Sequence, residues 1–154
     1  MASIKMGIER NGRKIIPCMF DKIKPAIVDG KESNEIFITQ NNGLFGFARV
    51  PTSTDDHSSR YTDTEYTNIS PFENGVAVVS RHCVSSGMQY GIINMYGAET
   101  LKCKYDDIQK LTDKFFLVRR NDKYGIYCVG CFDLFIPVAF THIEYEAEKF
   151  TLHI

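Results

Sequence analysis

Three short motifs recur four times in the same order along the 154-residue chain, and this repetition constrains the fold more than any other feature. The first motif is a glycine between two apolar residues, at 6–8, 45–47, 90–92 and 124–126. The second is aromatic–polar–x–Ile, at 20–23, 66–69, 105–108 and 140–143. The third is a short β-like run, at 36–40, 76–80, 115–119 and 150–154. We therefore expect one repeat domain, 1–154, with units at about 4–40, 43–82, 88–120 and 122–154.

One unit is predicted to be a three-stranded antiparallel meander. The glycine triplet lies in its first strand, and a second glycine follows in three units, at 11–12, 96–97 and 129–130. Glycine is expected in such turns because tight hairpins need a positive φ. The second strand runs into the aromatic motif, and a short bend leads to the third strand. Pro17 and Pro137 indicate a bulge or an edge in the second strand, because proline cannot donate to a ladder.

Side-chain packing follows from the same pattern. The glycine of each triplet is expected to leave a gap on the strand that a neighbouring aromatic ring covers. The isoleucine of the second motif is expected to point into the core. Extra residues at 26–33 and 51–65 are predicted to be loop insertions. One unit buries too little apolar surface to be stable alone, so the units are expected to stack.

The segments "KYGIYCVGCFDLFIPVAFTHIEY" (123–145) and "QYGIINMYGAETLKCKYDDIQKL" (89–111) resemble the WG (KWG) repeat of bacterial proteins. Residues 11–25 and 69–80 resemble portions of that repeat, although Met, Phe or Tyr replaces the family's tryptophan throughout. The resemblance implies a β-repeat scaffold suspected of binding other molecules. It supplies no catalytic residues.

The predicted fold is therefore all-β: four tandem three-stranded antiparallel meanders in a curved array. The alternative is a closed propeller- or barrel-like ring. Propeller blades usually have four strands, which favours the array. A closed ring would have no edge strands, and neither terminal unit shows an evident polar cap. Both points support the closed ring as an alternative.

Composition narrows the function. A net charge of −1 gives no field that favours nucleic acid or an anionic membrane. No apolar run is long enough for a transmembrane helix or a signal peptide, and five cysteines without a framework spacing favour a reducing, cytoplasmic compartment. No P-loop, dinucleotide fingerprint or nucleophile elbow occurs, so we expect a non-catalytic protein without a cofactor.

The polar loop 51–65 is the most distinctive candidate binding segment, because long loops on a rigid scaffold often carry function. Its acidic residues do not match the spacing of a calcium loop. The predicted binding residues are Asp55, Asp56, His57, Arg60 and Tyr61.

Cys128 and Cys131 form a C-x-x-C and are weak metal candidates, because the other three cysteines occur singly and zinc commonly takes four ligands. Thiols that flank a hairpin turn are the plainer interpretation. The four histidines are scattered along the chain. We expect a scaffold that binds a protein or peptide through its inter-strand loops, or alternatively a carbohydrate or small molecule in a Tyr-lined pocket. The oligomeric state stays open.

Overall fold

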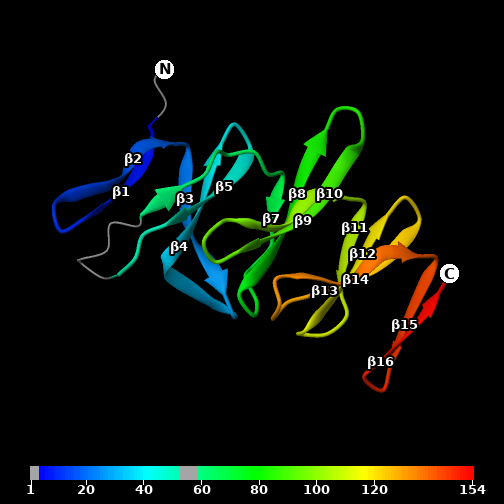
Figure 1. Ribbon diagram of the computed structural model, residues 1–154. Coiled ribbons are helices and arrows are strands. Elements are labelled where there is room, and N and C mark those ends of the chain that lie inside the picture. Colours follow the sequence, from blue (N-terminus) through cyan, green and yellow to red (C-terminus); the bar gives the residue numbers. More distant parts are fainter. Residues whose placement is uncertain (1–3, 53–58) are drawn as a thin grey trace.

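The computed structural model describes residues 4–52 and 59–154, whose regular structure is all β-strand (Figure 1). Within these two ranges, sixteen strands form five antiparallel sheets, and none of the sheets closes into a barrel. The sheets follow one another along the molecule in chain order, with the two termini at opposite ends. The expectation of an all-β open array is confirmed, and the sheets of the described residues do not close into a ring. These residues contain no helix with the length and apolar character needed to cross a bilayer.

Each repeat unit contributes four strands, where the sequence indicated three. The first unit contributes β1 (Met6–Arg10), β2 (Arg13–Phe20), β3 (Lys22–Val28) and β4 (Lys31–Asn41). The second contributes β5 (Leu44–Arg49), β6 (Arg60–Tyr61), β7 (Asn68–Ile69) and β8 (Val76–Cys83). The third contributes β9 (Gly87–Asn94), β10 (Glu99–Tyr105), β11 (Asp107–Lys110) and β12 (Phe115–Arg120). The fourth contributes β13 (Lys123–Cys128), β14 (Asp133–Phe140), β15 (His142–Glu146) and β16 (Lys149–His153).

The additional strand arises from the aromatic–polar–x–Ile motif. The chain bends at the polar residue and the isoleucine then lies in a new strand, β3, β7, β11 or β15. The first two strands of a unit therefore belong to one sheet and the last two belong to the next. The middle sheets, β3–β6, β7–β10 and β11–β14, each join two units, while β1–β2 and β15–β16 are two-stranded.

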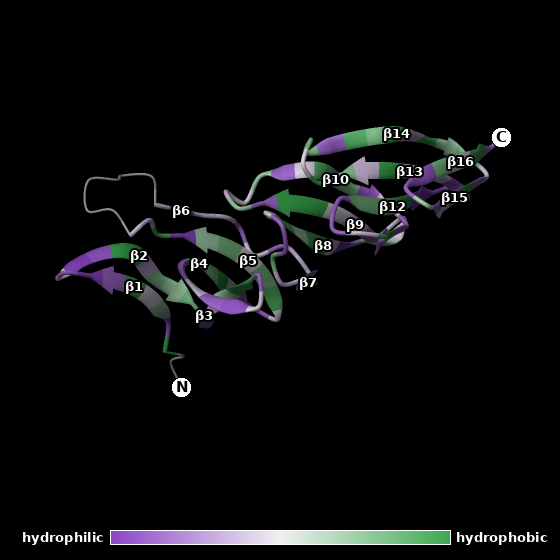
Figure 2. Ribbon diagram, turned by 90° about the horizontal axis from the view of Figure 1, so that it is seen from below, coloured by the Kyte–Doolittle hydropathy of each residue, from purple (hydrophilic) through white to green (hydrophobic). Residues whose placement is uncertain are grey.

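Four apolar cores lie between successive sheets, and neighbouring residues of a strand serve different cores. Phe47 packs toward β7–β10, whereas Ala48 packs toward β1–β2. In β13, Ile126 packs toward β15–β16 and Tyr127 packs toward β7–β10. Successive side chains of a strand point to opposite faces, so a sheet buried on both faces needs an apolar run rather than an alternating pattern. In β9 the consecutive residues 91–93 are all buried, and Figure 2 shows the strongly apolar end of this strand.

The glycine of the triplet lets the backbone of the second strand approach closely. The expectation that this glycine leaves a gap covered by an aromatic ring is therefore wrong. A Cβ on Gly125 would lie 2.6 Å from the carbonyl oxygen of Ile136 and 2.8 Å from the carbonyl carbon of Pro137. Gly7 and Gly91 face the same part of their second strands. The ladder is irregular there, between Tyr124 and Ile126 in the last unit, so the predicted bulge is confirmed.

Two turn predictions need correction. Gly12 and Gly97 have φ values of 75° and 80°, as expected, but in the turn after β13 the positive φ belongs to Phe132 at 53°. The expected insertion at 26–33 is instead the end of β3 and the start of β4, joined by a tight turn at Asp29 and Gly30. An Asp-Gly pair favours a two-residue hairpin, so this signal was present in the sequence.

Candidate binding site

The strand β6 forms one wall of the candidate site and is the outermost strand of the sheet β3–β6. It pairs with β5 through Ala48 with Tyr61 and Arg49 with Arg60. The next amide continues this register, because the Thr62 N–H donates to the Phe47 carbonyl at 2.8 Å. The edge of β6 opposite β5 is therefore not paired with any other strand of the described residues.

The turn between β9 and β10 forms the other wall. The Asn94 side chain fixes this turn, because its Oδ1 accepts the N–H groups of Tyr96 at 2.9 Å and Ala98 at 3.1 Å. A Cβ on Gly97 would come within 2.5 Å of the Phe47 ring. Glycine at this position thus lets a turn of the third unit rest on a core side chain of the second, which places Tyr96 beside β6.

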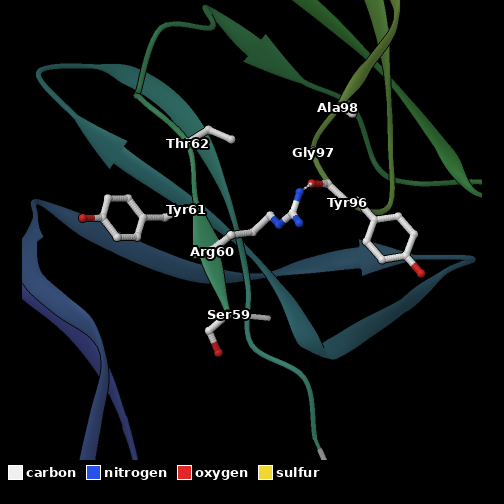
Figure 3. Close-up of a pocket in the computed structure, with 7 residues that line it drawn as sticks. All are labelled: Ser59, Arg60, Tyr61, Thr62, Tyr96, Gly97 and Ala98. Carbon is white, nitrogen blue, oxygen red and sulfur yellow. Dashed lines mark hydrogen bonds between the residues drawn. The ribbon is translucent and has the colours of Figure 1, made fainter. Parts of the chain in front are cut away.

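The two walls enclose an open groove of about 510 Å³ (Figure 3). Its lining comprises Ser59, Arg60, Tyr61, Thr62, Tyr96, Gly97 and Ala98. Arg60 extends toward the turn, and its Nη1 donates to the Tyr96 carbonyl at 3.5 Å. The rings of Tyr61 and Tyr96 lie on either side of Arg60 and point away from each other. The groove thus presents one guanidinium between two exposed phenol rings.

Both rings are anchored by side chains outside the groove. The Tyr61 ring packs edge-on against Phe20, with ring centroids 5.7 Å apart. The Arg49 guanidinium lies 4.1 Å from the centroid of the Tyr96 ring, and its Nη1 donates to the Met95 carbonyl at 3.3 Å. Anchored rings lose little conformational entropy when a ligand contacts them.

Comparison with known proteins identifies the repeats that form this part of the molecule. The model of the family described as WG containing repeat matches residues 63–81 and 90–124. Both segments are WG repeats. The second segment contains Tyr96 and the turn that forms one wall of the groove, while Arg60 precedes the first segment. No curated protein and no solved structure matches the chain.

The structure brings together only part of the predicted binding set. Arg60 and Tyr61 line the groove, and Asp55, Asp56 and His57 lie outside the described residues. The sequence did not indicate Tyr96 or Arg49. An aromatic residue in a hairpin turn was a usable signal for Tyr96, because turn side chains project into solvent. Arg49 had no such signal, since its role depends on contacts between two units.

Cys128 and Cys131 flank the turn between β13 and β14, and their sulfur atoms are 2.7 Å apart. The hydrogen bond with Cys128 raises the pKa of the Cys131 thiol, which favours its protonated form. Within residues 4–52 and 59–154, no third His, Cys, Asp or Glu completes a metal-binding cluster with the two sulfurs. The cysteine pair thus offers two of the four ligands that structural zinc commonly takes.

A second hollow, of about 550 Å³, lies at the interface between the sheet β11–β14 and the hairpin β15–β16. Its aromatic lining consists of Phe115, Phe135, Tyr145 and Phe150, with Phe135 exposed. The rings contact one another, with centroids 5.1 Å apart for Phe115 and Phe150 and 4.7 Å apart for Tyr145 and Phe150. Thr112, Asp113, Lys114 and Glu148 supply polar groups at the rim.

Proposed function

We propose that this protein is a non-catalytic scaffold that binds an extended, acidic peptide segment of a protein partner in the groove between β6 and the β9–β10 turn. The observation that carries the proposal is an unpaired strand edge bordered by an arginine and two anchored tyrosines. The sequence led us to expect that the segment 51–65, which contains β6, binds a protein or peptide partner, and the groove adds a turn of the next unit beside β6.

The edge of β6 suits an added strand. Hydrogen-bonded and non-bonded pairs alternate along an antiparallel ladder. Thr62 is bonded to Phe47, so Tyr61 occupies a non-bonded position, and its own N–H and C=O point away from β5. A peptide that pairs with these groups would gain main-chain hydrogen bonds, as in other cases of strand addition.

The side chains give the expected peptide its character. The contact from Arg60 to the Tyr96 carbonyl is long for a hydrogen bond, so the guanidinium can turn toward a carboxylate of the ligand. Tyr61 and Tyr96 offer ring faces to apolar or aromatic side chains on either side of that carboxylate. Rings that point away from each other are better placed along an extended chain than around a single small ligand.

A phage library of random linear peptides, selected on the purified protein, tests the proposal. We expect enriched peptides to contain an Asp or Glu with neighbouring apolar residues. Affinity for a synthetic copy, measured by fluorescence polarisation, is expected to fall about tenfold or more (~1.4 kcal/mol) in each of Arg60→Glu, Tyr61→Ala and Tyr96→Ala. N-methylation of alternate peptide amides is expected to weaken binding as well, because strand addition needs those N–H groups.

Arg120→Glu is the matched control, because it reverses an exposed arginine on a different sheet. This variant is expected to bind the peptide as the wild type does. Equal losses in Arg60→Glu and Arg120→Glu would mean that only overall charge matters. Enriched peptides that bind all three groove variants normally would place the binding surface elsewhere.

The aromatic hollow beside β15 supports a second candidate function, the binding of a carbohydrate or another small molecule. Sugars and flat apolar molecules bind on aromatic faces that have polar groups nearby, and Phe135 presents an exposed ring beside Tyr145 and Phe150. A glycan array, followed by titration of any hit against Phe135→Ala, tests this function. An array without hits would count against sugars as the ligand.

A further inference from the structure

The hairpin β15–β16 carries three potential metal ligands on one face. His142 and Glu144 are two residues apart on β15, so their side chains lie on the same face of the strand. His153 of β16 is the direct cross-strand partner of His142. The other face of the hairpin packs on the last core through Ile143 and Phe150, which leaves the face with the two histidines exposed.

The backbone fixes the two strands beside this cluster. The Thr141 N–H donates to the His153 carbonyl at 2.9 Å, and the Thr141 hydroxyl donates to the same oxygen at 3.0 Å. The two imidazole rings lie with centroids 5.2 Å apart and planes inclined at 45°. The histidines that are scattered in sequence are thus brought into contact by the register of the last hairpin.

The distances suit a chelated ion. The Nε2 atom of His142 lies 3.5 Å from Oε1 of Glu144, and the Nε2 atom of His153 lies 3.7 Å from Oε2 of the same carboxylate. One ligand atom from each residue can be chosen so that all three lie within 4.8 Å of one another. In a tetrahedral zinc site with bonds of about 2.0–2.1 Å, ligand atoms are about 3.3 Å apart. Small side-chain rotations of exposed residues are enough to close the remaining difference.

This cluster does not belong to the pattern that the four units share. The pairs that correspond to His142 and His153 in the preceding sheets are Asp107 with Arg119, Asn68 with Ser80, and Lys22 with Gln40. The outer face is polar along both strands, with Glu146 opposite Lys149 and Glu144 opposite Thr151. The last hairpin thus has a polar outer face, although the sequence showed no evident polar cap. The repeat pattern does not require histidine at these two positions.

We propose that His142, Glu144 and His153 bind one divalent transition-metal ion of the Zn²⁺ type, with the fourth position left to water or another ligand. Two imidazoles and one carboxylate suit Zn²⁺, Co²⁺, Ni²⁺ and Cu²⁺, whereas Ca²⁺ and Mg²⁺ prefer sites made of oxygen ligands. The site is separate from the groove beside β6, so it stands or falls independently of peptide binding.

Calorimetric titration of the protein with Zn²⁺ tests the site, after removal of any purification tag. Cys128 and Cys131 are replaced by serine in every sample, so that their thiols cannot contribute. We expect one ion per chain, and a loss of affinity of at least about tenfold in each of His142→Ala and His153→Ala, since even outer-shell changes weaken zinc sites that much. His82→Ala is the matched control, because it removes an exposed histidine from another sheet and is expected to bind normally.

Two further measurements keep the result interpretable if a variant folds poorly. Co²⁺ bound to the unaltered site is expected to give a visible absorption band, which excess Zn²⁺ removes and excess Mg²⁺ does not. Paramagnetic Co²⁺ is expected to broaden the amide resonances of residues 142–144 and 151–153 first. Absence of stoichiometric Zn²⁺ binding, or binding that survives both histidine substitutions, would overturn the proposal.

Discussion

The cysteine side chains of this chain differ in chemistry because their surroundings differ. The Cys83 thiol and the Ser85 hydroxyl form a hydrogen bond, with 3.4 Å between Sγ and Oγ, and the backbone of Ser85 and Ser86 also forms hydrogen bonds with the sulfur. These bonds lower the pKa of the Cys83 thiol to about 7. Burial instead raises the pKa of the Cys103 thiol to about 12. Only the first of these two thiols is a good nucleophile near neutral pH.

Alkylation by iodoacetamide tests this difference at single residues. The thiolate is the reactive form, so the rate at Cys83 is expected to rise with pH and reach half its maximum at about pH 7. Ser85→Ala removes the largest stabilising contact and is expected to move this midpoint to higher pH. Peptide mapping by mass spectrometry measures each site, with Cys103 as the internal control. A Cys83 midpoint unchanged by Ser85→Ala would contradict the role of the hydroxyl.

At the scale of the element, the β13–β14 hairpin contains two glycines with different roles. Gly125 lies against the backbone of the bulged strand, whereas a Cβ on Gly130 would meet nothing within 4 Å. Gly125→Ala is therefore expected to lower the free energy of unfolding by about 2 kcal/mol or more, because the added carbon forces the strands apart. Gly130→Ala is expected to change it by less than about 0.5 kcal/mol. Urea denaturation of both variants measures the difference, and equal effects would show that the bulge tolerates a side chain.

The elements also show which parts of the structure the sequence could predict. The repeat order, the all-β class and the bulge at Pro137 follow from local residue preferences. The additional strand of each unit could not be predicted, because the short segment from Asp107 to Lys110 pairs with β12 of its own unit, and its half-buried Ile108 packs against a core shared with another sheet. Arg60 and Tyr61 were predictable as loop residues. Tyr96 reaches them only through contacts between two units.

At the scale of the whole molecule, the described residues form a one-dimensional stack, in which each of the four apolar cores joins two successive sheets (Figure 1). The three middle sheets bury both faces. The terminal hairpins β1–β2 and β15–β16 have two strands each and one partner sheet. In such arrays stability is close to a sum of unit and neighbour terms, so the ends are the least stable parts.

Native-state hydrogen exchange tests this gradient of stability. Amides of β8, β9, β12 and β13 are expected to exchange most slowly, and amides of β1–β2 and β15–β16 to exchange faster, because the terminal hairpins can open without disturbing a middle sheet. Mass spectrometry of peptic peptides measures the rates. A single common rate for all strands would mean that the array unfolds as one cooperative unit.

The seam between repeats passes through the middle of a sheet, between β4 and β5, β8 and β9, or β12 and β13. A gene duplication or deletion that covers one full period therefore leaves every remaining strand beside a neighbour of the correct kind, whichever residue it starts from. A change of half a period would place two first halves, or two second halves, of a unit side by side. The glycine of a triplet would then no longer face a bulged strand. The fold thus allows the array to gain or lose whole repeat periods. The inserted or deleted segment must be one full period long, but it can begin at any residue.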